Sequence, residues 1–135
     1  MGNYMSDNKW ILREDHGAGV ISLTMNCAPV NALTSENLNF MAKLLDNLED
    51  DNSIKSLVIN SSFKVFSAGI NLKEAQDFDL DAQGAMVRGL NTVFSKLFQF
   101  SKPVIVASEG AAIAGGFFFI LTSDYRVAVQ KVCLD

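Results

Sequence analysis

The runs Leu57-Val58-Ile59 and Val104-Ile105-Val106 decide the fold class that this sequence predicts. Each run is short and apolar, as is typical of a strand buried on both faces in a parallel sheet covered by helices. Pro103 comes directly before the second run, where its missing N–H costs the sheet no hydrogen bond. We therefore predict strands over 55–60 and 103–107.

A segment with helical spacing of its apolar residues precedes each of these strands. Thr34 can cap the first helix, and the apolar positions that follow it are Leu38, Met41, Ala42, Leu45 and Leu48. The second segment repeats the spacing with Ala82, Met86, Leu90, Val93, Leu97 and Phe100. Because the first helix ends on the acidic residues 49–51, which oppose the helix dipole, we expect that end to fray. Helix followed by buried strand, twice over, predicts an α/β fold.

Three further segments complete this outline. Residues 20–25 alternate between apolar and polar, as a half-buried strand does. The apolar run at 117–121 predicts a buried helix, and 125–129 a last strand. No repeat or linker interrupts the chain, so we expect one domain over 1–135, with a polar N-terminal extension at 1–10.

Composition excludes several classes of protein. With 49% hydrophobic and 19% charged residues the chain is expected to be globular, and its net charge of −4 argues against nucleic acid or an anionic membrane as partner. Cys27 and Cys133 have no Cys or His at metal-ligand spacing, which favours two buried free thiols and no metal. The first ten residues lack the apolar core of a signal peptide, so we expect a cytoplasmic protein.

Two loops of small residues combine with the start of a predicted helix. One lies within 64–74 and contains Ser67-Ala68-Gly69, and the other lies within 108–117 and contains Gly115-Gly116. Ligands of α/β folds gather where strands end and helices begin, because helix N-termini offer unpaired N–H donors. The alternative interpretation is that these small residues only permit tight turns and close packing.

At these residues the sequence resembles the crotonase (enoyl-CoA hydratase/isomerase) superfamily over 20–128. Residues 29–34, Pro-Val-Asn-Ala-Leu-Thr, resemble its Asn-Ala-Leu-Ser/Thr helix start, and 65–72 resemble its Phe-Ser-Ala-Gly-x-Asp-Leu motif. Residues 102–107 open a further motif that continues through the glycine pair to Ser-Asp-Tyr-Arg-Val-Ala at 123–128. The resemblance implies a crotonase-like (ClpP/crotonase) spiral of ββα units with parallel sheets and flanking helices, whose C-terminal helical part is absent from this chain.

The resemblance also implies an acyl-CoA thioester as ligand. The backbone N–H groups of Ile70 and Gly115 would form the oxyanion hole, and the main chain around Ala68 would receive the adenine. Substrate and coenzyme A contacts would come from Ser67, Ala68, Gly69, Ile70, Asn71, Leu72, Gly115 and Phe118. Two such donors stabilise charge that appears only in the enolate transition state. No metal and no cofactor beyond the coenzyme A of the substrate is implied.

Phe118 favours one member of the superfamily over the others. It stands where crotonase-type hydratases carry their first glutamate, and phenylalanine cannot transfer a proton. The sequence is therefore most similar to the delta3,delta2-enoyl-CoA isomerases, which use one later glutamate. That base is expected beyond Asp135, in a longer protein that forms a homotrimer or hexamer. The alternatives are a catalytically silent acyl-CoA-binding or scaffold protein, a hydratase, or another enolate chemistry of the superfamily.

Two residues or stretches depart from the family pattern. Asn71 replaces the usual Asp, and no Lys or Arg lies between Arg13 and Lys43, where many members carry a base for the coenzyme phosphates. We therefore expect any phosphate contact to come from elsewhere in the chain. For Asp124 and Arg126 we expect ion pairs with neighbouring elements.

Overall fold

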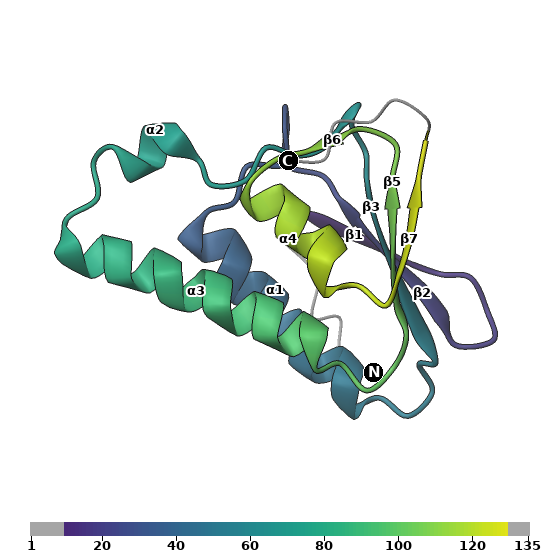
Figure 1. Cartoon of the computed structure of the whole chain (residues 1–135). Helices are drawn as coiled ribbons and strands as arrows, with labels where there is room; N and C mark the ends of the chain where they lie inside the picture. The colour runs from purple at the N-terminus through teal and green to yellow at the C-terminus, as the bar shows by residue number, and fades with distance from the viewer. Residues whose placement is uncertain (1–9, 130–135) are drawn as a thin grey trace.

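The computed structural model describes residues 10–129, and Figure 1 shows their arrangement. The elements are, in chain order, β1 (Ile11–Asp15), β2 (Val20–Met25), α1 (Ser35–Asp50), β3 (Ser56–Ser61), β4 (Val65–Ser67), α2 (Leu72–Ala75), α3 (Leu80–Phe98), β5 (Val104–Ser108), β6 (Ala111–Ala112), α4 (Gly115–Thr122) and β7 (Tyr125–Ala128). Within this range no helix combines the length and the apolar character needed to cross a membrane.

The main sheet has the strand order β1-β2-β3-β5-β7. Strands β2, β3, β5 and β7 run parallel, and β1 pairs with β2 in the antiparallel sense. The four predicted strands and their parallel pairing are confirmed. β4 and β6 form a separate two-stranded sheet that the sequence did not predict. β1 was also missed, because four of its five residues are exposed and it has no apolar stripe.

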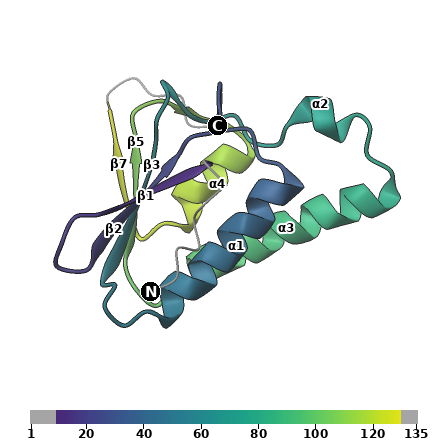
Figure 2. The ribbon, with the colours of Figure 1, turned by 180° about the vertical axis from the view of Figure 1, so that it is seen from behind.

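Helices α1, α3 and α4 all lie on one side of the main sheet, as the two opposite views agree (Figures 1 and 2). Leu57 and Ile59 point into that core and are fully buried, whereas Val58 between them is half-buried. The prediction that the apolar runs are buried on both faces is therefore wrong. The physical reason is that the described helices cover only one face of the sheet.

Helix α1 begins as predicted, because the Thr34 hydroxyl accepts a hydrogen bond from the Asn37 amide at 3.1 Å. The predicted apolar stripe is buried apart from the half-buried Ala42, and Leu44 joins it. The acidic end does not fray but stays helical to Asp50. The Lys102 ammonium donates to the carbonyls of Leu48, Glu49 and Asp51 at 2.6, 3.0 and 2.7 Å. This cation lies two residues before β5, far away in sequence, and supplies the favourable charge that the last turn lacks.

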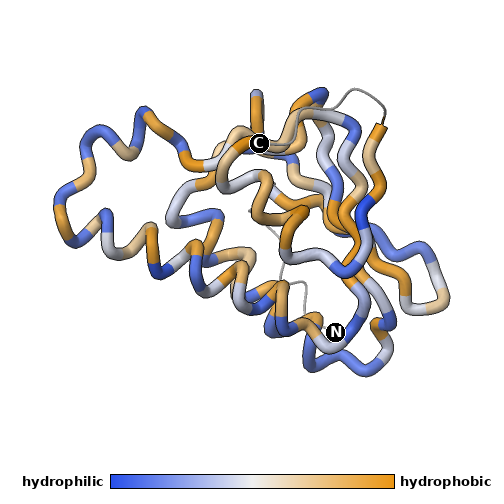
Figure 3. The backbone as a smooth tube through the Cα atoms, viewed as in Figure 1, coloured by the Kyte–Doolittle hydropathy of each residue, from blue (hydrophilic) through white to orange (hydrophobic). Residues whose placement is uncertain are grey.

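Helix α4 is apolar along its length (Figure 3), but only one side of it is buried. Phe119 is fully buried, while Phe118 and Leu121 are each 51% exposed, so the prediction of a buried helix holds only in part.

Among the residues that the structure describes, Asp124 and Arg126 do not form the expected ion pairs. The Asp124 carboxylate accepts from the Val104 amide at 2.8 Å, and the Arg126 guanidinium donates to the carbonyls of Ile120 and Ser123 at 3.0 and 3.1 Å. Asp124 thus ties the turn before β7 to the start of β5, and Arg126 ties β7 to the end of α4, both through main-chain groups. A charged group that meets carbonyls and amides at a helix end needs no charged partner.

Candidate functional site

The two small-residue loops meet because β4 and β6 run parallel. Val65 pairs with Ala111 and Ser67 with Ala112, so the carboxyl ends of both strands lie side by side. A third segment joins them at Leu33, whose amide donates to the Gly69 carbonyl at 2.7 Å and whose carbonyl accepts from the Asn71 amide at 3.0 Å. The small sheet therefore brings together the residues after β4, the residues before α4 and the residues before α1.

The amides of Ile70 and Gly115 are neighbours at this junction. A Cβ built on Gly69 would lie 3.0 Å from the Gly115 nitrogen, and a Cβ built on Gly115 would lie 3.9 Å from the Ile70 nitrogen. Within residues 10–129 neither amide donates to a main-chain carbonyl, whereas the next amide, that of Gly116, donates to Ile113. The junction thus offers two adjacent, unused N–H donors.

The direction of these donors follows from the geometry of the peptide. In a trans peptide the C=O and the N–H point in opposite directions. The Gly69 carbonyl points toward the Leu33 amide, and the Ala114 carbonyl points into α4, where it accepts from Phe117. The Ile70 and Gly115 N–H groups must therefore point away from those partners, toward the space around the junction.

Gly69 and Gly116 are glycines for different physical reasons. A Cβ at Gly116 would lie 2.2 Å from the Ser67 carbonyl oxygen, so close packing alone requires glycine there. Gly69 has a φ of +84°, which also favours glycine. The packing interpretation thus explains these two glycines. It does not explain why the Gly115 amide is left unpaired.

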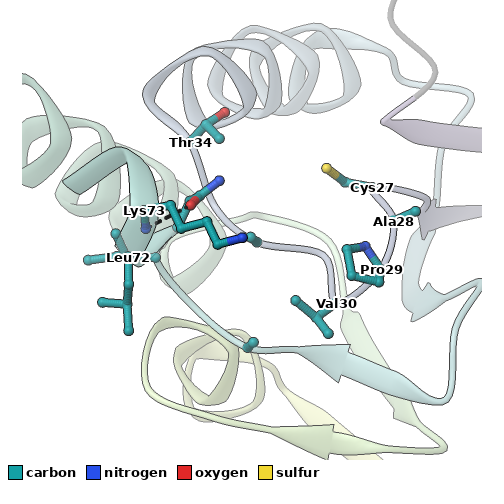
Figure 4. A pocket seen from close by; sticks show the side chains of 11 residues that line it. Cys27, Ala28, Pro29, Val30, Thr34, Leu72 and Lys73 are labelled. Carbon is teal, nitrogen blue, oxygen red and sulfur yellow. Dashed lines mark hydrogen bonds between the residues drawn. The ribbon is translucent and has the colours of Figure 1, made fainter. Parts of the chain in front are cut away.

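Two pockets flank Ile70, which lines both. The α3 pocket has a volume of about 370 Å³ and is lined by Ile70, Leu90, Asn91, Phe94, Ala114, Gly115 and Phe118. The α2 pocket has a volume of about 450 Å³ and is lined by Cys27, Ala28, Pro29, Val30, Ala32, Thr34, Ala68, Ile70, Asn71, Leu72 and Lys73. Figure 4 shows the Lys73 side chain reaching from α2 across this second pocket toward Pro29 and Val30.

Most of the residues that the resemblance pointed to lie at these pockets. Ala68, Ile70, Asn71 and Leu72 line the α2 pocket, and Gly115 and Phe118 line the α3 pocket with Ile70. Ser67 and Gly69 line neither of the two pockets and are buried. Their contacts are with the protein itself.

The Asn71 side chain caps the N-terminus of α2. Its Oδ1 accepts from the amides of Lys73 and Glu74 at 3.1 and 3.2 Å, which caps α2. An amide oxygen serves as well as a carboxylate oxygen in such a cap, so replacing the usual Asp costs little here.

Sequence reasoning missed several lining residues. Lys73 directly follows the first motif, so its position offered a signal. The middle of α3 supplies Leu90, Asn91 and Phe94, and no signal in the sequence pointed to them. The helical spacing of Leu90 and Phe94 predicts only a core position, and Asn91 belongs to no motif. Cys27 is half-buried and lines the α2 pocket, while Cys133 lies outside the described residues. Among residues 10–129 no cluster of three or more His, Cys, Asp or Glu is placed to hold a metal ion.

Comparison with known proteins gives a consistent result. The sequence model of the family described as Enoyl-CoA hydratase/isomerase matches residues 15–133. The chain is 31% identical over 117 residues to a probable enoyl-CoA hydratase of Bacillus subtilis, covering 85% of this chain and 45% of that protein. It is similar to the solved structure of human mitochondrial delta3-delta2-enoyl-CoA isomerase, with 32% identity, a TM-score of 0.83, and coverage of 87% of this chain and 46% of that one.

The Pseudomonas aeruginosa protein DspI matches with 28% identity and a TM-score of 0.89, over 98% of this chain and 54% of that one. The chain spans 45% of the length of the Bacillus subtilis relative and 35% of the length of the human mitochondrial methylglutaconyl-CoA hydratase. Hydratases and isomerases both occur among these relatives.

Proposed function

The chain belongs to the enoyl-CoA hydratase/isomerase family, and from this membership we propose that the whole protein isomerises the double bond of enoyl-CoA thioesters. The α/β fold with its mostly parallel sheet is the crotonase fold that the motifs implied. Because the chain spans about half of the solved structures it matches, the proposal concerns the protein as a whole.

The observation that carries the proposal is the pair of unused amides where the two pockets meet. A thioester oxygen seated there would accept from the Ile70 and Gly115 N–H groups, and both would stabilise the negative charge of the enolate. The Gly115 amide also lies at the N-terminus of α4, where the helix dipole favours negative charge. Loss of one such donor typically costs about 2.7 to 4 kcal/mol in the barrier.

Each pocket suits one part of the ligand. The apolar lining of the α3 pocket by Leu90, Phe94 and Phe118 suits an acyl chain. The α2 pocket suits the coenzyme, because Lys73 offers an ammonium group to a phosphate and the exposed Ala68 lies at the pocket wall, where the adenine is expected. Lys73 is thus a candidate for the phosphate contact that the stretch between Arg13 and Lys43 does not provide.

Phe118 supports isomerisation over hydration. It lines the α3 pocket, where its ring lies 5.5 Å from that of Phe94, and none of the residues between 10 and 129 that line this pocket carries a carboxylate. Hydration through two carboxylates therefore lacks one of them at this position. We propose that one carboxylate from outside the described residues moves the proton from C2 to C4 of the acyl chain.

An assay of the whole protein tests this proposal. We expect it to convert a 3-enoyl-CoA into the conjugated 2-enoyl-CoA, which is followed by the absorbance of the conjugated thioester. Rapid hydration of 2-enoyl-CoA with no migration of the double bond would show that the isomerase assignment is wrong.

A second candidate is a protein that binds acyl-CoA without turning it over. The lining of the α3 pocket favours it, because Asn91 is the only polar side chain among the described residues there, and a neutral amide does not act as a general base. Calorimetry with an acyl-CoA would then show binding, while 3-enoyl, 2-enoyl and other acyl-CoA thioesters would stay unchanged. Measurable isomerisation would exclude this candidate.

A further inference from the structure

Ser67 contacts all three segments that meet at the site, although it lines neither pocket. Its side chain is fully buried. Its hydroxyl donates to the Asn31 carbonyl at 2.9 Å and accepts from the Gly69 amide at 3.2 Å. Its own carbonyl accepts from the Ile113 amide at 3.0 Å. One residue therefore ties the segment before α1, the loop after β4 and the loop before α4 together.

Asn31 gives the Ser67 hydroxyl a rigid acceptor. It is fully buried and has a φ of +50°, which is uncommon for a residue other than glycine. Its Oδ1 accepts from the Cys27 amide at 2.8 Å, and its Nδ2 donates to the Ser61 hydroxyl at 2.8 Å and the Phe66 carbonyl at 2.9 Å. Such a fully satisfied buried network has one geometry, because leaving a member unpaired costs free energy.

The chain of hydrogen bonds ends next to the two donors. The Gly69 amide bound by Ser67 belongs to the peptide just before the one that carries the Ile70 N–H. The Ile113 amide bound by the Ser67 carbonyl precedes the Gly115 N–H by two residues. Gly116 packs against the same carbonyl at a distance that leaves no room for a side chain. Ser67 therefore connects the two loops that carry the donors.

We propose that Ser67 is a positioning residue, which with Asn31 holds the Ile70 and Gly115 amides at the spacing that the enolate oxygen requires. This inference rests on the proposed function. It assigns Ser67 a role other than the ligand contact implied by the family motif. Because the donors stabilise charge mainly in the transition state, a shift of their position acts on kcat more than on KM.

The test compares Ser67→Ala with the wild type in the whole protein, on a 3-enoyl-CoA. We expect kcat to fall about 10- to 100-fold, since a misplacement of about 1 Å can cost 10²-fold, while KM changes by less than about threefold. Ser123→Ala is the matched control, because Ser123 is also buried and its hydroxyl also donates to a carbonyl, that of Ile120 at 2.6 Å, at the far end of α4. The control is expected to lose similar stability and keep its kcat.

The outcomes separate this inference from the proposed function. A wild-type protein without isomerase activity contradicts the proposed function. An active wild type with an unchanged kcat in Ser67→Ala, or an equal loss of kcat in Ser123→Ala, overturns the positioning role alone. If Ser67→Ala does not fold, Ser67→Cys decides by the same criteria, because it keeps the size and replaces the hydroxyl with a much weaker donor and acceptor.

Discussion

Gly115 contributes a main-chain amide to the proposed site, and this allows a clean test at a single residue. It is the first residue of α4, a position where proline is accepted because its missing N–H has no partner within the helix. Gly115→Pro therefore removes the donor at a helix position that accepts proline, although Ala114, with φ of +49° and ψ of −117°, must change its backbone conformation before the proline. We expect kcat for isomerisation to fall about 10² to 10³-fold.

Gly115→Ala is the control for crowding in that experiment. Its Cβ would lie 3.0 Å from Leu33 Cδ1, so it adds a similar contact while keeping the N–H. We expect it to retain most of the activity. Equal losses in two folded variants would show that space at this position matters and that the amide does not.

At the scale of a single element, the C-terminal end of α1 is stabilised by a cation from another segment, Lys102. The Lys102 ammonium donates hydrogen bonds to three carbonyls at the end of the helix and lies 5.9 Å from the centre of the Phe100 ring. Lys102→Met keeps the aliphatic stem and removes the ammonium. Because hydrogen bonds to charged groups contribute about 1.5 to 3 kcal/mol, we expect a loss of that order in the free energy of unfolding, measured by urea titration.

Lys96→Met provides the comparison for that measurement. Lys96 pairs with Asp46 on the exposed side of α1 and α3, and such surface pairs contribute about 0 to 1 kcal/mol. We expect its unfolding midpoint to stay close to that of the wild type. Equal losses in the two variants would mean that Lys102 acts as an ordinary surface lysine.

The apolar surface beside β7 matters at the scale of the whole molecule. All four residues of β7 are exposed, Val127 is 53% exposed, and Leu121 of neighbouring α4 is 51% exposed. An edge strand with apolar neighbours is a template for pairing with another chain. We therefore expect the 135-residue chain on its own to self-associate at micromolar concentration, as seen by sedimentation, and Val127→Lys to reduce that association.

Val87→Lys is the control for added charge in that experiment. Val87 is 55% exposed on α3, away from β7. A chain that sediments as a monomer, or one in which both substitutions act equally, would contradict a role of the β7 edge.

Local patterns were sufficient to predict the main elements from the sequence. The helical spacing from Leu38 to Leu48 correctly predicted a helix, because a face buried by regular structure repeats at a fixed interval, and the apolar run at 57–59 correctly predicted a strand. The motif residues around Ile70 and Gly115 also pointed to the loops that meet. Strands β4 and β6, with three and two residues, are too short to show any period.

The sequence by itself determined the α/β class, the family and the two loops, because these depend on residues close together in the chain. Only the tertiary structure decided which distant groups meet: Asn91 of α3 in the same pocket as Gly115, Lys102 at the end of α1, and Ser67 between the two loops. Such contacts depend on how packed layers and parallel strands place their ends. No spacing along the chain encodes that placement.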